Sequence, residues 1–305
     1  MSTPIIHCNS LVKKHYARVA LNNLTFRLDE GEVLLVTGPS GSGKTSLINI
    51  ISGIDTFNAG NLLIFDMDAN KNKDFVKQIS CSWQSPSLYQ NLSIEKNLNF
   101  FSDLYQLPKR ETYKEINDLL EGFDLINKRK QYLATLSQSD QKKVDLCRTL
   151  IGNKKLLILD EPFSLLDASS IKFLLNILIN KKRQGCGIII STKNISACED
   201  LIDKILLLKD GNVIMNKKID TVIERRDKVI VIKPLKPVDK IIFKKISFVN
   251  DVQEVGNVFH LRLKKDIPNL NELIPYFDEL GISIENIRIK QPSLQAAVEE
   301  VLSNA

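Results

Sequence analysis

Up to about residue 215, short aliphatic runs alternate with segments of helical hydrophobic spacing. The runs are hydrophobic at nearly every position, which favours strands that are buried on both faces. Such strands are typical of a parallel sheet covered by helices, so the pattern predicts an α/β fold. The clearest runs are Glu32–Thr37, Asn61–Phe65, Leu156–Asp160 and Gly187–Thr192.

The pattern changes twice along the chain. Between about 85 and 150 the segments are amphipathic, rich in Lys and Asn, and carry no strong strand, which predicts a helical insert. After about 225 the sequence predicts strands at 228–234, 240–249, 258–266 and 282–290, a helix at 270–280 and a capped helix from Ser293. We therefore expect an α/β domain over residues 1–220 and a small α+β domain over residues 221–305.

Composition limits the possible functions. The 305 residues hold 42 Lys and Arg and 36 Asp and Glu, a formal charge of +6, which is too mild to indicate nucleic-acid binding by itself. The five cysteines are scattered without a C-x-x-C pair, so we expect free thiols in a reducing compartment. The first residues do not resemble a signal peptide, and no apolar run approaches about 20 residues, so any membrane role requires a partner.

A glycine-rich segment, GPSGSGKT at residues 38–45, fits the pattern G-x-x-x-x-G-K-[ST]. A buried strand precedes it and a helix follows, which is the context in which backbone N–H groups and a helix N-terminus surround phosphates. Lys44 would reach the β- and γ-phosphates, and the Thr45 hydroxyl would bind Mg²⁺. The predicted nucleotide-binding residues are Gly38, Pro39, Ser40, Gly41, Ser42, Gly43, Lys44, Thr45 and Ser46.

Two acidic residues, Asp160 and Glu161, follow directly from the buried run LLILD. At the carboxyl end of a strand beside the phosphate loop, Asp160 would hold Mg²⁺ through water. Glu161 is placed to polarise an attacking water as a general base. The sequence therefore predicts nucleotide hydrolysis with Mg²⁺ as cofactor.

Over about residues 3–215 these motifs and their order resemble the ATP-binding subunit of ABC transporters. The resemblance implies that Tyr16 stacks on adenine and that Gln84 contacts Mg²⁺ or the attacking water and senses a membrane partner. It also implies that the segment Ser164–Asp167 crosses a dimer interface. The expected partners are an integral-membrane permease and a second ATPase subunit, with no nucleic acid.

Two segments depart from the family pattern. Leu136–Asp140 reads LSQSD where the family has LSGGQ, a segment that caps the γ-phosphate held by the other subunit. Gln138 and Ser139 add Cβ atoms there, and at about 5 Å and an effective dielectric of 20 a charged Asp140 would repel a phosphate by roughly 3 kcal/mol. Lys193 replaces the family's histidine; it can still supply a cation to the γ-phosphate.

These departures leave two assemblies open: a slow ATPase homodimer, or a heterodimer with a subunit that carries an intact LSGGQ. The segment from Gln291 to Val298 resembles the closing element of the exporter branch, with Val298 in place of an aromatic, and favours export. We expect a peripheral protein on the cytoplasmic face of the inner or plasma membrane. The alternatives are a regulatory ATP-binding subunit with little hydrolysis and a soluble ABC ATPase outside transport.

Overall fold

The computed structural model describes residues 4–16, 18–223, 229–244, 246–247, 249–263, 277–290 and 293–304. The chain divides into two compact units. The first comprises Met1–Ile219 together with Val301–Ala305, and the second comprises Asp220–Glu300. Each unit has its own group of buried apolar side chains.

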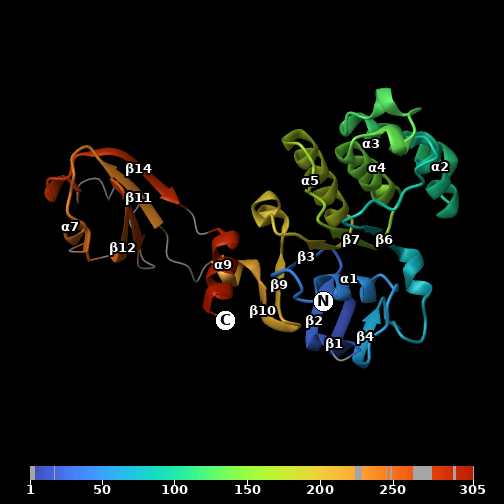
Figure 1. The fold of residues 1–305 in the computed structure, drawn as a ribbon, viewed down its shortest axis with the longest axis horizontal. Helices are drawn as coiled ribbons and strands as arrows, with labels where there is room; N and C mark the ends of the chain where they lie inside the picture. Colours follow the sequence, from blue (N-terminus) through green and yellow to red (C-terminus); the bar gives the residue numbers. More distant parts are fainter. Residues whose placement is uncertain are drawn as a thin grey trace. The chain divides into compact units, whose positions relative to one another are not determined.

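The first unit is built on a six-stranded sheet (Figure 1), in which the five strands other than the edge strand β10 run parallel. The predicted strands at 32–37, 156–160 and 187–192 are confirmed, and every residue of the corresponding strands is buried. In spatial order the strands are β10 (Asn212–Lys218), β9 (Lys204–Lys209), β3 (Val33–Thr37), β8 (Gly187–Ser191), β7 (Leu156–Asp160) and β6 (Ile79–Ser82).

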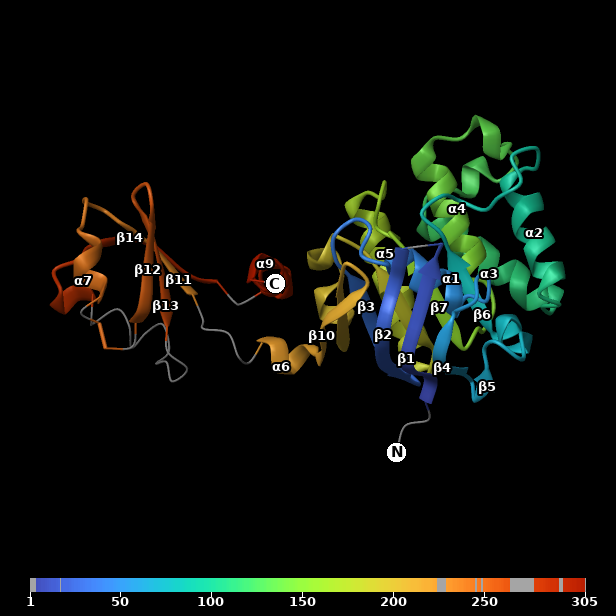
Figure 2. The same ribbon diagram turned by 60° about the horizontal axis from the view of Figure 1, so that its bottom comes forward.

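A second, antiparallel sheet, seen in Figure 2, holds the run that the sequence assigned to the parallel sheet. That assignment of Asn61–Phe65 was wrong: the run lies in β4 (Ala59–Ile64), which pairs antiparallel with β1. Its first three residues are exposed and only Leu62 and Ile64 are buried, so one face of the strand is covered. The other strands are β1 (Pro4–His15), β2 (Arg18–Asp29) and β5 (Met67–Asp68).

Helix α1 (Lys44–Ile51) contributes Leu47, Ile48, Ile50 and Ile51 to a core that includes side chains from both sheets. This burial fixes the start of α1 against the end of β3, and therefore fixes the turn that joins them. Burying each such aliphatic side chain contributes about 1.5–3 kcal/mol to the free energy of unfolding. The core thus fixes the two ends of the segment at 38–43.

The helical insert predicted between about 85 and 150 lies beside the parallel sheet, where Figure 1 shows α2, α3 and α4 grouped together. Helix α2 (Ile94–Leu104) begins at Ser93 and α4 (Gln138–Leu150) at Ser137, and each serine hydroxyl accepts a bond from a backbone N–H of the first turn. Helix α3 (Lys109–Gly122) lies between them in the chain, and α5 (Ala168–Arg183) follows β7. Short 3₁₀ turns occupy Asp74–Gln78, Ile126–Lys128, Leu133–Thr135, Ile195–Ala197 and Glu199–Leu201.

The second unit contains an antiparallel sheet in the order β12-β13-β11-β14. Its strands are β11 (Val229–Pro234), β12 (Val249–Val255), β13 (Val258–Leu263) and β14 (Ile284–Lys290). The strands predicted at 228–234, 258–266 and 282–290 are confirmed over the described residues that form β11, β13 and β14. The helix predicted at 270–280 falls largely outside the described residues. Helix α6 (Ile219–Ile223) lies at the boundary between the units.

The strand predicted over 240–249 was wrong: the structure has helix α7 (Lys240–Lys244) there, and β12 starts only at Val249. Phe243 and Ile246, three residues apart, are both buried in the core of this unit, which suits a helical turn. Asp239 Oδ1 accepts a bond from Ile241 N at 2.9 Å and so supports the turn. The predicted final helix is confirmed as α9 (Leu294–Asn304), with Ser293 Oγ accepting from Ala296 N at 3.2 Å.

Candidate nucleotide-binding site

The turn between β3 and α1 has a backbone that only glycine adopts easily. Gly38, Gly41 and Gly43 have φ of 145°, 80° and 105°. A Cβ on Gly38 would lie 2.0 Å from Leu208 O, and one on Gly43 would lie 2.5 Å from Ala20 O. The three glycines therefore allow a tight loop that directs its backbone inward at the start of α1, as a phosphate cradle requires.

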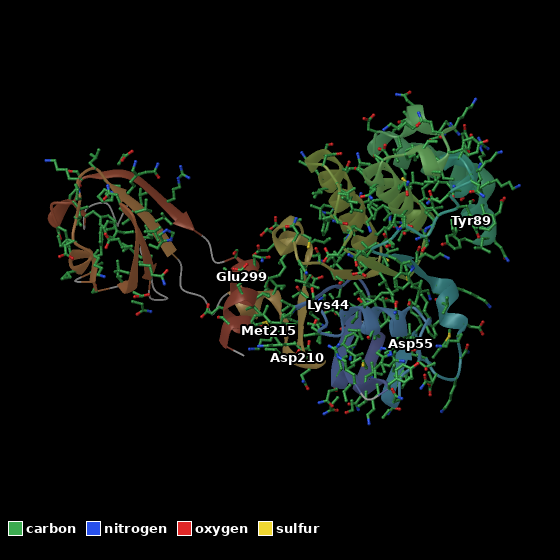
Figure 3. All side chains as sticks on the ribbon, in the orientation of Figure 1. Lys44, Asp55, Tyr89, Asp210, Met215 and Glu299 are labelled. Carbon is green, nitrogen blue, oxygen red and sulfur yellow. The ribbon has the colours of Figure 1, made fainter. Side chains whose placement is uncertain are left out.

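Lys44 lies at the start of α1, where Figure 3 labels it, and its ammonium folds over this loop. Lys44 Nζ donates to Gly38 O at 2.7 Å, to Pro39 O at 2.8 Å and to Ser42 Oγ at 3.4 Å. Burial lowers the pKa of Lys44, the nearby charge of Lys193 lowers it further, and Glu161 and Asp160 oppose both effects. The Lys44 ammonium is thus held at the loop, where it interacts electrostatically with Asp160 and Glu161.

A pocket of about 200 Å³ opens beside the loop. Arg18 Nη2 donates to Gly41 O at 3.3 Å, and His15 Nε2 lies 3.3 Å from Ser46 Oγ. Sequence reasoning missed both side chains, although their positions on either side of Tyr16 could have suggested them. The lining residues are His15, Arg18, Ala20, Gly41, Gly43, Lys44, Thr45 and Ser46.

Tyr16, predicted to stack on adenine, is fully exposed and has a φ of 51° in the turn between β1 and β2. His15 and Arg18, close to Tyr16 in the chain, line the pocket, whereas Tyr16 is not one of the lining residues. An exposed aromatic ring has a face available for stacking on a base. The role of Tyr16 stays a prediction.

The acidic pair lies at the carboxyl end of β7. Asp160 is buried at the strand end, and Glu161 follows with a φ of 46°, in the sparsely populated left-handed region. Glu161 N donates to Ser191 O at 2.7 Å, while its carboxylate accepts from Thr192 Oγ1 at 3.0 Å and from Lys193 N at 3.2 Å. Both carboxylate oxygens of Glu161 are therefore held by the segment that follows β8.

Lys193 joins this segment to the phosphate loop, because its Nζ donates to Ser40 Oγ at 3.1 Å. The cation that replaces the expected histidine thus lies at the loop. The Lys193 backbone N–H, as well as its ammonium, contributes to the geometry of the site, since the former holds Glu161. Lys44 and Lys193 together form a cationic edge suited to a polyphosphate.

Gln84 lies in the exposed stretch that follows β6. Strand β6 runs parallel to β7 with Ser82 opposite Leu159, so the Gln84 loop leaves the sheet at the same edge as Asp160. Gln84, the acidic pair and the phosphate loop therefore all follow the carboxyl ends of parallel strands, at the same edge of the sheet. Oxygen atoms from Thr45, Gln84 and Asp160 are the ligand type that Mg²⁺ prefers, so the residues present fit this metal.

The Leu136–Asp140 segment starts α4. Ser137 Oγ accepts from Asp140 N at 3.1 Å, and the Asp140 carboxylate pairs with Lys128 Nζ at 2.8 Å. The Asp140 side chain is only 14% exposed. Its charge is therefore paired with a lysine of the same chain, and we expect this pairing to weaken the repulsion between Asp140 and a phosphate.

The segment Ser164–Asp167 ends at the start of α5. Asp167 Oδ1 accepts from Ser170 N at 2.8 Å, and Asp167 Oδ2 pairs with Lys143 Nζ at 2.7 Å. The bond from Lys143 and those from Ser169 and Ser170 hold the pKa of Asp167 far below its usual range. This aspartate joins α5 to α4, the helix that begins with the Leu136–Asp140 segment.

These features define a phosphate-loop nucleotide-binding domain: a buried parallel strand, a glycine-rich turn, a helix that starts with lysine, and two acidic residues at the end of another strand of the same sheet. Residues 21–164 match the ABC transporter family. A solved "ATP binding subunit of ABC transporter" is 27% identical to the chain, with a TM-score of 0.68 over 72% of this chain and 91% of that one. Residues 21–164, which lie within the first unit, therefore contain an ABC transporter family domain.

Two curated relatives extend the comparison. The spermidine/putrescine import ATP-binding protein PotA of Bacillus thuringiensis (strain Al Hakam) is 30% identical over 204 residues, which are 66% of this chain and 62% of PotA. The chain thus spans less than two thirds of that relative. The doxorubicin resistance ATP-binding protein DrrA of Mycobacterium tuberculosis (strain CDC 1551 / Oshkosh) is 27% identical over 295 residues, 93% of this chain and 89% of DrrA.

A dimeric ATP-binding cassette bound to ADP and Pi shares the fold, with a TM-score of 0.63 and 24% identity over 70% of this chain and 98% of that one. Among the helices that the structure describes, none combines the length and the apolar character needed to cross a bilayer.

Proposed function

We propose that this protein is the ATP-binding and ATP-hydrolysing subunit of an ABC transporter, acting on a separate membrane permease from the cytoplasmic face of the inner or plasma membrane. The observation that carries the proposal is the joint placement of Lys44, Glu161 and Lys193 around the phosphate loop. Lys193 Nζ and Lys44 Nζ both bond to atoms of that loop, and Lys193 N holds Glu161.

In this proposal Gly38–Ser46 binds the phosphates of ATP, and Tyr16 stacks on the base. Thr45, Asp160 and Gln84 hold Mg²⁺, which would neutralise phosphate charge when bound. Glu161 orients and deprotonates the attacking water once one of its carboxylate oxygens is released from Thr192 or Lys193. Lys44 and Lys193 stabilise the negative charge that develops on the transferred phosphoryl group.

Export is the direction that we propose. The match to DrrA covers 93% of this chain and therefore extends through the second unit, whereas the match to PotA covers 66%. A relative whose name denotes drug resistance thus shares more of the whole chain than one whose name denotes import. The alternative assembly, a heterodimer with a second ATPase, is supported by the two added Cβ atoms at Gln138 and Ser139.

The test is MgATP binding by the purified chain and by Lys44→Ala, with Lys172→Ala on the exposed surface of α5 as the matched control. We expect the wild type and the control to bind MgATP and Lys44→Ala to bind it at least about tenfold more weakly. Failure of the wild type to bind, or equal binding by Lys44→Ala, would refute the proposal. Affinity purification from detergent-solubilised membranes then tests for a co-eluting permease and a second ATPase.

A further inference from the structure

A lysine that no predicted motif includes lies at the centre of the site's supporting structure. Lys142, in the second turn of α4, is 1% exposed. Its ammonium donates to Trp83 O at 2.9 Å, to Ser82 Oγ at 3.3 Å and to the backbone oxygen of Asp160 at 3.3 Å. One buried cation therefore joins α4 to the end of β6 and to the end of β7.

The charges around Lys142 explain why an ammonium is tolerated there. Asp145, fully buried, accepts from Ser82 Oγ at 2.7 Å and from Arg148 Nη2 at 2.8 Å. Two buried cations thus accompany one buried aspartate, so the cluster carries a surplus positive charge beside Asp160 and Glu161. Burial lowers the pKa of Lys142 and the nearby charge of Arg148 lowers it further, whereas Asp145, Asp160 and Glu161 favour its charged form.

The two strand ends that Lys142 joins are those that carry the site. Gln84 follows Trp83 directly, and Glu161 follows Asp160 directly. A displacement of α4 would therefore move both ends through one set of three hydrogen bonds. Placement errors of about 1 Å at a reacting centre can reduce a rate about a hundredfold, so such a connection matters for turnover.

We propose that Lys142 is a positioning residue that holds the Gln84 loop and the Asp160–Glu161 pair in register and transmits the position of α4 to them. This inference rests on the proposed ATPase function, because it assigns Lys142 a part in that same site. It also assigns a role to α4. Through Lys142, this helix positions the ends of β6 and β7, which precede Gln84 and Glu161.

The single tryptophan of the sequence, Trp83, can serve as a fluorescent probe of the contact between Lys142 and the end of β6. Trp83 is the only tryptophan of the 305 residues, it packs partly buried against the core of the first unit, and its carbonyl is a direct acceptor of Lys142. Its fluorescence therefore reports the position of the β6 end without any turnover.

The experiment compares Lys142→Met, which keeps the apolar stem but removes the donors, with Lys142→Gln, which keeps a donor without the charge. Lys181→Met is the matched control, since Lys181 is also buried, lies on α5 and donates to Gly152 O at 2.9 Å. For each variant we measure MgATP affinity, kcat, Trp83 emission with and without MgATP, and thermal unfolding.

We expect Lys142→Met to lower kcat by at least about tenfold while its MgATP affinity stays within about threefold of the wild type. Trp83 should emit at longer wavelength, and the change in its emission on adding MgATP should be lost. Lys142→Gln should lie between Lys142→Met and the wild type, and Lys181→Met should match the wild type in every respect except stability.

An unchanged Trp83 response in folded Lys142→Met would overturn the inference, as would the same losses in Lys181→Met. If Lys142→Met does not fold, Lys142→Gln decides in the same way. A wild type that fails to bind MgATP would refute the proposed function instead. If it binds without measurable turnover, the MgATP-induced change in Trp83 emission alone decides the role of Lys142.

Discussion

At the scale of single residues, the departures from the family pattern differ in physical kind. Lys128 engages the carboxylate of Asp140 at 2.8 Å, so the electrostatic obstacle that the sequence suggested is largely neutralised within the chain. The Cβ atoms of Gln138 and Ser139 have no such compensation, because a glycine backbone cannot be restored by a neighbour. Steric crowding is therefore the stronger expected reason for slow turnover.

Because the two departures differ in kind, we expect Ser139→Gly and Asp140→Gln to affect the ATPase rate differently when each is made alone. Ser139→Gly should raise the ATPase rate of a purified homodimer, whereas Asp140→Gln alone should stay within about twofold of the wild type. The double variant should resemble Ser139→Gly. Steady-state phosphate release checks this, with dimerisation in ATP confirmed by light scattering. A rise caused by Asp140→Gln alone would show that the charge acts despite Lys128.

The cysteines give a second prediction at this scale. All five are free in the described chain, and burial raises the pKa of Cys8, Cys81 and Cys198 to about 12 and that of Cys186 to about 11. Because the thiolate is the reactive form, very little of each is present at neutral pH. We expect slow modification by a disulfide reagent in the native state and five fast equivalents in denaturant. Since Cys81 is partly buried and the other four are buried, more than one fast native thiol would contradict the structure.

At the scale of elements, Asp167 connects two helices. It caps α5 through Ser170 N and pairs with Lys143 of α4. Since its carboxylate is 51% exposed, the ion pair contributes little and the cap contributes more. The pKa of Asp167 is lower in the folded chain, so this stabilisation is present above the unfolded pKa, near 4, and is lost as pH falls below it.

Replacing the cap should therefore cost stability in a pH-dependent way. Asp167→Ala should lower the free energy of unfolding by about 1 kcal/mol at pH 7. Asp167→Asn, which keeps a capping oxygen, should lose less. Denaturant unfolding at pH 7 and at pH 3 measures both, and the difference between wild type and Asp167→Ala should shrink at pH 3. Equal differences at the two pH values would exclude the ionised carboxylate as the cause.

The elements also show what a sequence can and cannot specify. Strands β3, β7 and β8, buried along their whole length, are recognisable because every position carries the same signal. The run at 61–65 gives a similar signal, but its sheet is decided by pairing with β1, some fifty residues away. Ile241 and Ile242 favour a strand locally, yet burial of Phe243 in the second unit decides for helix α7.

The site follows the same rule. The GPSGSGKT loop and the pair Asp160–Glu161 are predictable, because each has a local spacing that its chemistry requires. Contacts such as Lys193–Ser40, Lys128–Asp140 and Lys142–Trp83 join residues of different elements, and single-residue identity does not reveal them. Lys142 in particular reads as a surface lysine of a basic helix, and only tertiary packing buries it.

At the scale of the molecule, all candidate site residues lie between His15 and Lys193, within the first compact unit. The second unit has its own core, built on Ile230, Phe243, Phe259 and Phe277. We therefore expect the nucleotide site to form without side chains of the second unit. The last residues of the chain belong to the first unit again, with Val301 and Leu302 partly buried.

A chain shortened to residues 1–219 separates these contributions. Its MgATP affinity should stay within about twofold of the full chain, since the loop, the acids and Lys193 remain. Its Tm should fall, because the partial burial of Val301 and Leu302 is lost. Calorimetry and thermal unfolding test both. Weaker MgATP binding in a folded short chain would show that the second unit supports the site directly. Intact binding with lost activity on membranes would show that the second unit couples ATP hydrolysis to the permease.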